Sequence, residues 1–542
     1  MLSMRLFLII MAIFCFILVS CGDDDDDNDT GNSDDDDTSP DDDDDTAPDD
    51  DTAPDDDTTT VDDDDTGSDD DTDDDDTDDD DTGDDDTILP DDYVAPWPQE
   101  NIEVQDYDES GTAGPLRLKA TAYDDWHRTW HQPDHGCCAH VFFTDETQTE
   151  VAQYHGIGDS TEWTGQYAAS EAYRYYITGD SLAKQIVVEK IADLDGLLHV
   201  TGRAGFIARY WGSQAMLDMY GAAGWCDSAD RCHKVDTGTY AGDFWMGETS
   251  RDMYTGWFYG MVTAYDLVDD EPMREMIGDD VTEVLDELLA NNWWIIDEAG
   301  QPTDAGPNVL PGQQLAWITI GYHITGHERY KQELGRLLED KRRQWFKLNN
   351  ITFFNRYSSY FGNALAHRIW YTILRLGRVY YSPADFEFMA NVFEKQVHTF
   401  ARLSHNPWFN AIFMAQGDYD PSETAYQDQL EEDLTVFQDP PLAEFYLPAK
   451  DPSTYTLDPV SVFFTDLVTQ FPFLEEILGG FQYQALEPFG VDGYCPAGFM
   501  FQWSPFVIEE CGADDPTKVH SGHDYLAAYW LAAYHKFIGK EM

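Results

Sequence analysis

Residues 159–199 read DSTEWTGQYAASEAYRYYITGDSLAKQIVVEKIADLDGLLH. Trp163 to Ile177 has helical periodicity, and Asp159 and Glu162 have the spacing of a capping box at the start of such a helix. Thr178-Gly179-Asp180 then provides a stop signal followed by a new N-cap, and the helical pattern continues to about His199. The stretch therefore predicts a helical hairpin with a tight turn.

The same arrangement of helix, break and helix recurs further along the chain. The first helices are rich in aromatic and small residues, which predicts burial, whereas the second helices carry one apolar stripe and many charges. Such hairpins, arranged as an inner and an outer ring, form an all-α, (α/α) toroid; an open helical solenoid is the alternative. Further helices are predicted from near Ser250 through Tyr254 to Val268 and again from Pro272, at Gln313–Ile324 and on to Trp345, at Asn363–Leu376 and on to Arg402, near Phe463–Leu478, and at Tyr525–Phe537.

Two helix starts carry a family resemblance. Gly158 to Gly165 reads GDSTEWTG, Ser250 to Gly256 reads SRDMYTG, and the hairpin turns contain Thr-Gly followed by Asp or His. These stretches resemble the six-hairpin (α/α)6 toroids of glycoside hydrolases and polysaccharide lyases. The resemblance covers about Tyr154 to Arg402 and the last 40 residues. It implies a carbohydrate-active domain whose pocket opens where the inner helices and their preceding loops converge.

The N-terminus has the pattern of a secretory signal. Arg5 is followed by an apolar run from Leu6 to Val19, whose 14 residues are too short to span a bilayer as a helix. Leu18-Val19-Ser20-Cys21-Gly22 resembles the lipobox of bacterial lipoproteins. This resemblance implies cleavage after residue 20 and lipid attachment at Cys21, and Gly22 indicates export to an outer membrane. An ordinary secretory signal is the alternative.

A long acidic segment follows the lipobox. Between Gly22 and Asp92 there are 41 aspartates and no Lys or Arg. Such a segment has almost nothing to bury and repels itself, so residues 21–95 are predicted to be a disordered tether that reaches about 250 Å when fully extended. Weak calcium binding is the alternative to a plain spacer. The whole chain has a net charge of −78, which argues against nucleic acid and other polyanions as partners.

Residues 96–542 are predicted to form the globular domain. All 16 tryptophans lie there, and no Pro/Gly/Ser linker divides it. The Asn101–Val151 stretch is turn-rich, with an expectation of one or two strands. Gly417 to Asp458 has little periodicity and is predicted to be a long insertion. In an exported chain the cysteines predict the local disulfides Cys226–Cys232 and Cys495–Cys511, whereas Cys137 and Cys138 form either a vicinal disulfide or two thiols.

The candidate site residues lie at or just before the predicted inner helices. Glycoside hydrolysis needs two carboxylates, one protonated and one ionised, and the candidates are Asp159 or Glu162 together with Asp252. Asp304 and Asp524 are the substitutes. A helix cap and an ion pair with Arg251 are the structural alternatives for these acids. Residues with the rings, amides and charges that bind sugars complete the predicted site: Trp163, Arg251, Tyr254, Asp304, His405, Trp408, Trp503, His523 and Asp524.

Three other functions remain open from the sequence. A lyase would need a base such as Tyr254, Tyr357 or His405 and a cation such as Arg251. The histidine-rich stretch from His127 to His140 could ligate a metal, although Pro133 interrupts its helical spacing and no recognised zinc spacing is present. A glycan-binding or scaffold lipoprotein would need the same residue types as an enzyme. No P-loop, GxGxxG or GxSxG motif occurs, and no cofactor is predicted.

Overall fold

The computed structural model describes residues 113–136, 138–219, 231–339, 346, 360–416, 424–474, 482–493, 504–508 and 510–539. The predicted signal, Cys21 and the acidic tether lie outside these residues. Within the described ranges, no helix has both the length and the apolar character needed to cross a membrane.

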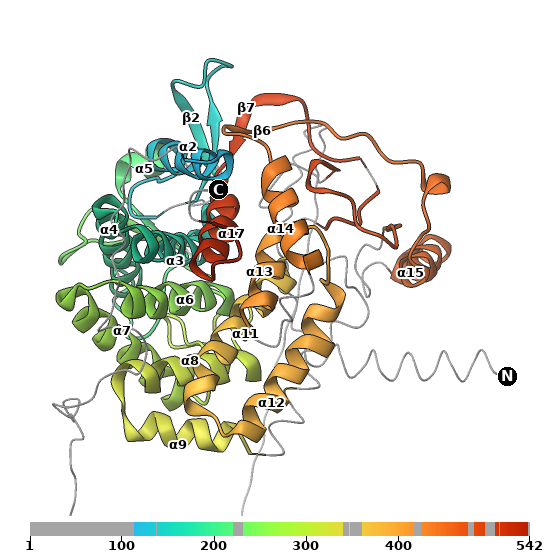
Figure 1. Ribbon diagram of the computed structural model, residues 1–542. Coiled ribbons are helices and arrows are strands. Elements are labelled where there is room, and N and C mark those ends of the chain that lie inside the picture. The colour runs from blue at the N-terminus through green and yellow to red at the C-terminus, as the bar shows by residue number, and fades with distance from the viewer. Residues whose placement is uncertain are drawn as a thin grey trace, which may run out of the picture. The chain divides into compact units, whose positions relative to one another are not determined.

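Twelve helices form six pairs, each with an inner and an outer member (Figure 1). Five pairs consist of consecutive helices, and the sixth joins the last helix of the domain to the first. The pairs are α3 (Ser160–Thr178) with α4 (Ser181–His199), α6 (Arg251–Leu267) with α7 (Glu271–Ala290), α8 (Pro311–Thr325) with α9 (Glu328–Leu337), α11 (Tyr360–Tyr380) with α12 (Pro383–Val392), α13 (Pro407–Ala415) with α14 (Thr424–Val436), and α17 (His523–Tyr534) with α2 (Pro115–Trp130).

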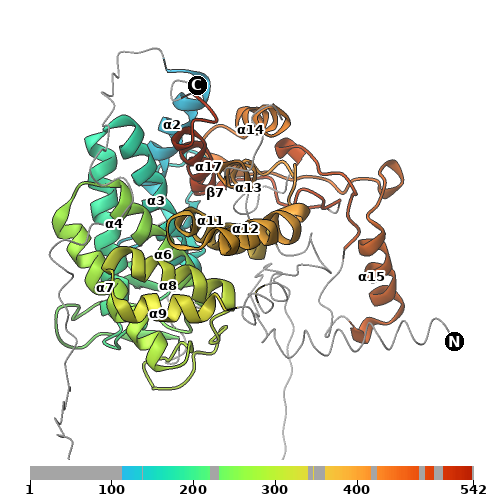
Figure 2. The same cartoon turned by 60° about the horizontal axis from the view of Figure 1, so that its bottom comes forward.

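The inner helices close into a ring. Helix α3 contacts α6, α6 contacts α8, α8 contacts α11, α11 contacts α13, α13 contacts α17, and α17 returns to α3. Figure 2 shows α8 and α9 side by side, as their contacts require. This closure confirms the predicted all-α, six-hairpin toroid and excludes the open solenoid.

The hairpins form for the reasons that the sequence indicates. Gly179, at the C-terminal end of α3, has a φ of 68°, a left-handed conformation that glycine adopts without strain. Asp180 then caps α4 by accepting a hydrogen bond from the backbone N–H of Leu182, and Asp270 caps α7 in the same way. Helix α3 is buried on nearly every side and α4 on one face, as expected for inner and outer positions.

Three glycines bring α3 and α6 into backbone contact. A Cβ atom added to Gly165 would lie 2.0 Å from the carbonyl oxygen of Gly256, and one on Gly256 would lie 2.4 Å from the Cα of Glu162. A Cβ on Gly260 would lie 2.7 Å from the Cα of Gly165. The two inner helices therefore cross at a distance that only glycine permits. This crossing fixes the first turns of α3 and α6 next to each other.

The structure differs from the sequence prediction in three ring helices. Helix α2 lies within the stretch predicted to be turn-rich, and α13 was not predicted. Helix α14 occupies Thr424–Val436, inside the predicted insertion at Gly417–Asp458, and it is the outer helix of the fifth pair. The longest excursion from the ring instead lies between α14 and α17, and it contains α15 (Pro459–Gln470).

Two small antiparallel sheets accompany the ring. The first has the strand order β2-β1-β7-β6, and the second has the order β3-β5-β4. The strands are β1 (His140–Phe143), β2 (Val151–His155), β3 (Tyr210–Gly212), β4 (Cys232–Lys234), β5 (Phe244–Met246), β6 (Leu442–Glu444) and β7 (Asp515–His520). Short helical segments are α5 (Gln214–Met219), η1 (Ile157–Asp159), η2 (Phe393–Val397), η3 (His398–Phe400), η4 (Pro452–Thr454), η5 (Pro472–Leu474) and η6 (Val491–Gly493).

Candidate active site

Three carboxylates lie at the adjoining first turns of α3 and α6. Asp159 immediately precedes α3, Glu162 lies in its first turn, and Asp252 lies in the first turn of α6. The negative charges of Asp159 and Asp252 both raise the pKa of Glu162, so the three groups are close enough to interact electrostatically. The structure thus brings together the carboxylates that the sequence singled out.

Asp159 is held by an arginine that the sequence analysis did not identify. Its Oδ1 lies 3.3 Å from Nη1 of Arg209, which also donates to the backbone carbonyl of Gly158. Partial burial raises the pKa of Asp159 and Arg209 opposes this shift, while 36% of the side chain stays exposed. Asp159 makes no side-chain hydrogen bond to the end of α3, so the predicted capping box is wrong. Its carboxylate is accordingly available to a ligand.

Glu162 and Arg368 form a fully buried ion pair beneath Asp159 and Asp252. Glu162 Oε1 accepts a hydrogen bond of 2.5 Å from Arg368, whose Nε donates to Gln166. The other carboxylate oxygen, Oε2, is buried and has no hydrogen-bond partner among the described residues. The guanidinium lies within 6 Å of the ring centres of Trp163 and Trp408. These contacts make the Glu162–Arg368 pair the polar centre of the ring.

Burial raises the pKa of Glu162 to about 8. Arg368 opposes this shift, whereas the charges of Asp159 and Asp252 add to it. A folded-state pKa above the unfolded value means that folding favours the protonated form. The contribution of Glu162 to the free energy of unfolding is therefore fully present below about pH 4.5, and it is lost as the pH rises through about 8.

We expect Glu162→Gln to be about as stable as the wild type below about pH 4.5, because the amide has the shape and charge of the carboxyl that is protonated there in both the folded and the unfolded state. Wild-type stability should fall relative to the variant as the pH rises from about 5 to 8, measured by chemical unfolding across that range. If Glu162→Gln instead lowered the free energy of unfolding by about 3–5 kcal/mol at every pH, Glu162 would be ionised in the folded protein. The substitution would then leave the buried charge of Arg368 without a counterion.

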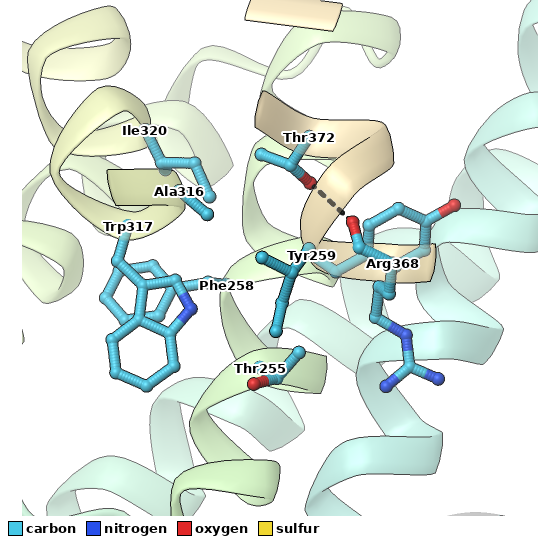
Figure 3. Close-up of a pocket in the computed structure, with 9 residues that line it drawn as sticks. Thr255, Phe258, Tyr259, Ala316, Trp317, Ile320, Arg368 and Thr372 are labelled. Atoms are coloured by element: carbon cyan, nitrogen blue, oxygen red, sulfur yellow. Dashed lines mark hydrogen bonds between the residues drawn. The ribbon is translucent and has the colours of Figure 1, made fainter. Parts of the chain in front are cut away.

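Arg368 also borders a small cavity at the contact of α6, α8 and α11 (Figure 3). Its volume of ≈ 10 Å³ suits about one water molecule. Figure 3 shows the guanidinium turned away from Trp317 and Ile320, which line the apolar side. The cavity is thus too small for a sugar ring, so it is not the substrate site.

Several residues predicted to bind substrate are core residues instead. Trp163 is 1% exposed and Trp408 is fully buried, so neither ring offers a face to a ligand. Tyr254 is buried as well, and its hydroxyl donates to the carbonyl of Gly205 at 2.7 Å. His523 and Asp524 have no exposed surface, so Asp524 is not accessible as a substitute for either candidate carboxylate. The burial of these residues was not predicted from the sequence.

The remaining predicted residues lie at several places. His405 is half-buried and its Nδ1 lies 2.6 Å from Oδ1 of Asp433 on α14, an interaction that raises the pKa of His405. Arg251 is partly exposed and donates to the carbonyl of Asn308 at 3.4 Å, and Asp304 is exposed. Arg251 and Asp304 therefore keep the accessibility that a binding residue needs. Trp503 lies outside the described residues.

Arg368 and Gln166 are site residues that sequence reasoning missed. Both lie on inner helices, and Arg368 interrupts the apolar run of α11. A charged residue in a helix that is predicted to be buried needs a partner inside the fold. That requirement was the signal that could have identified Arg368. No comparable signal marks Arg209, which lies in a loop.

The histidine-rich stretch is mainly a core feature. His127 and His131 lie on or just after α2, are fully buried and stack with ring centres 5.8 Å apart. His131 Nδ1 lies 2.6 Å from the carbonyl oxygen of Ala139, and burial lowers the pKa of His131 to about 3. His135 is partly exposed and stacks on Trp211 instead. The three histidines thus have separate packing roles.

The cysteine predictions remain open. Cys138 is buried, with its Sγ 3.3 Å from the carbonyl oxygen of Trp163, but Cys137 lies outside the described residues. Cys226 and Cys495, the predicted partners of Cys232 and Cys511, also lie outside them. Both disulfides therefore stay predictions.

Comparisons with known proteins give one structural similarity to report. No protein-family model matches the sequence, and no curated protein is similar to it. The crystal structure of a cellulase of C. cellulolyticum is similar to this chain with a TM-score of 0.38 and 11% identity, covering 79% of this chain and 100% of the cellulase. A similarity of this size decides neither fold nor activity. The contacts of the helices themselves establish the toroid.

Proposed function

We propose that this domain hydrolyses a glycan, with Asp159 as general acid and Asp252 as general base or nucleophile. The observation that carries the proposal is the grouping of these two partly exposed carboxylates over the buried Glu162, at the glycine-mediated contact of α3 and α6. Two carboxylates of opposite protonation are the requirement of glycoside hydrolysis.

The environments of the two carboxylates support these different roles. The pKa of Asp159 is raised by partial burial, which favours the protonated form that an acid needs. Arg209 fixes the position of this carboxyl through contacts to Asp159 and to the neighbouring backbone. The buried Glu162–Arg368 pair joins α3 to α11. The acidic composition of the chain favours a neutral glycan over a polyanionic one.

The geometry disfavours a polysaccharide lyase. Tyr254 is buried and bonded to backbone, and its pKa is raised by that burial, so it does not serve as a surface base. His405 is paired with Asp433, which favours its protonated form. Tyr357 lies outside the described residues. Of the residues named above for a lyase, Arg251 is partly exposed and could therefore bind a carboxylate.

A glycan-binding or scaffold lipoprotein is the second candidate function. The full burial of the Glu162–Arg368 pair favours it, because a buried ion pair gives one of the three carboxylates a purely structural role. In that case Asp159 and Asp252 would contact hydroxyl groups without transferring protons. Only turnover distinguishes this candidate from an enzyme.

We further propose that Cys21 is lipidated and that the acidic segment holds the toroid away from an outer membrane, on its periplasmic or outer side. The lipobox-like sequence and the 41 aspartates support this arrangement. A Cys21→Ala variant should leave the membrane fraction, as measured by fractionation and immunoblotting. Continued membrane association would contradict anchoring at Cys21.

The hydrolase proposal is tested by incubating the purified full chain with a panel of neutral and uronate oligosaccharides, followed by mass spectrometry. Fragments that gain one water are expected, and an Asp159→Asn, Asp252→Asn double variant should not produce them. Unsaturated fragments would show a lyase instead. No products from any glycan, together with retained binding, would favour the binding lipoprotein.

A further inference from the structure

Two outer helices face each other with a cluster of ionisable side chains that includes none of the three carboxylates of the candidate active site. Asp195 and His199 are four residues apart on α4, and Asp280 and Glu283 are three residues apart on α7. These spacings place each pair on one face of its helix. Helices α4 and α7 are in contact, so the two pairs meet across the interface.

The donor atoms of this cluster are close enough to share one ion. One donor atom each from Asp195, His199 and Asp280 lie within 4.8 Å of one another. His199 Nδ1 lies 3.1 Å from Asp195 Oδ1, and His199 Nε2 lies 3.6 Å from Glu283 Oε2. Neighbouring ligands of a tetrahedral zinc ion with bonds of about 2.0–2.1 Å are about 3.3 Å apart.

Asp280 is the buried carboxylate of this cluster. Its side chain is buried, with 3% exposed, and its Oδ2 has no hydrogen-bond partner in the part of the chain that the structure describes. Among the described residues, no Lys or Arg pairs with either Asp195 or Asp280. His199 is the basic group beside Asp195, and the two carboxylates of Asp195 and Asp280 that face each other across the helix interface repel one another unless a proton or a cation lies between them.

We propose that Asp195, His199 and Asp280 bind a zinc ion that clamps α4 to α7. Imidazole together with carboxylate oxygens is a donor set that suits zinc. Glu283 accepts a hydrogen bond from the backbone of Gly205 through Oε1, and its Oε2 or a water molecule completes four-coordination. The side chains of His199 and Asp195 are 39% and 28% exposed, so an ion can enter from solvent.

The competing occupant is a proton. The carboxylates of Asp195 and Glu283 raise the pKa of His199 to about 11, and an imidazolium would itself neutralise part of the cluster. Zinc binding would displace this proton. The two occupants are distinguished by adding metal, because only the zinc site is stabilised by it.

The test is thermal unfolding of the EDTA-treated full chain, with and without micromolar zinc chloride. Zinc should raise the Tm of the wild type by several degrees, and Asp280→Asn and His199→Gln should each lose this rise. His233→Gln is the matched control, since His233 faces one carboxylate at 3.5 Å, and it should keep the rise. Asp280→Asn should also raise the Tm in EDTA by removing one of the two facing carboxylates, which shows that this variant folds.

Cobalt provides a second readout that the acidic tether cannot imitate. Intense visible absorption of a tetrahedral Co²⁺ complex is expected in the wild type and in His233→Gln, and its loss is expected in both cluster variants. An unchanged Tm with zinc and no tetrahedral cobalt spectrum would overturn the proposal in favour of a proton-bound cluster. An equal Tm rise in the wild type and both variants would place zinc elsewhere and overturn it as well.

Discussion

Gly256→Ala lowers the free energy of unfolding by more than about 3 kcal/mol, an effect at the upper end for one added methyl group. The new Cβ would lie 2.4 Å from both the Cα and the carbonyl oxygen of Glu162. These are backbone atoms of a buried inner helix, so no side-chain rotation relieves the clash. Helices α3 and α6 must move apart, which also separates Asp252 from Asp159.

The matched control is Gly278→Ala on the outer helix α7. A Cβ at this position would meet nothing within 4 Å, so alanine should raise stability by up to about 1 kcal/mol through its higher helix propensity. Chemical unfolding of both variants measures the difference. If Gly256→Ala were as stable as the wild type, α3 and α6 would not cross at the distance described.

Asp252→Asn lowers the turnover of a glycan substrate by about 10²–10⁴-fold, as expected when one group that transfers a proton is removed. The side chain is partly exposed at the start of α6, so the isosteric amide should leave the Tm nearly unchanged. Turnover on a substrate found in the oligosaccharide panel, together with the Tm, provides the measurement.

Asp279→Asn is the control for charge alone. Asp279 is exposed on α7, away from the three carboxylates, and its amide variant should keep full turnover. Equal activity of Asp252→Asn and the wild type would remove Asp252 from the reaction. A loss of activity that is accompanied by a lower Tm would indicate structural damage rather than lost chemistry.

The first hairpins could be predicted because their signals are local. Gly179 ends α3 and Asp180 caps α4, so the stop and the next cap lie within two residues. Asp270 likewise caps α7. The fifth pair was harder to predict. Helix α13 has only nine residues, and α14 has a polar composition that resembles a loop. Helix α2 pairs with α17 at the opposite end of the chain, a contact that no local pattern encodes.

The site was predictable in its carboxylates and not in its surroundings. Asp159 and Asp252 precede or begin predicted helices, and the hairpin pattern predicted that the starts of these helices converge. Trp163, Trp408 and Asp524 also lie near helix starts, yet they turn inward. Which residue of a first turn faces the ring and which faces solvent depends on how closely the helices cross. Glycine contacts between α3 and α6 set that distance, and they are tertiary.

The pairing of α17 with α2 determines when this domain can fold. Tyr525 on α17 donates a hydrogen bond to the carbonyl of Leu116 and stacks on Tyr123, which joins segments about four hundred residues apart. Until the last helix has been synthesised, α2, α3 and α13 each lack a neighbour, and their apolar faces stay open to other chains. Ring closure is therefore a late and slow event of high contact order. A nascent or C-terminally truncated chain carries the risk of aggregation until that event occurs.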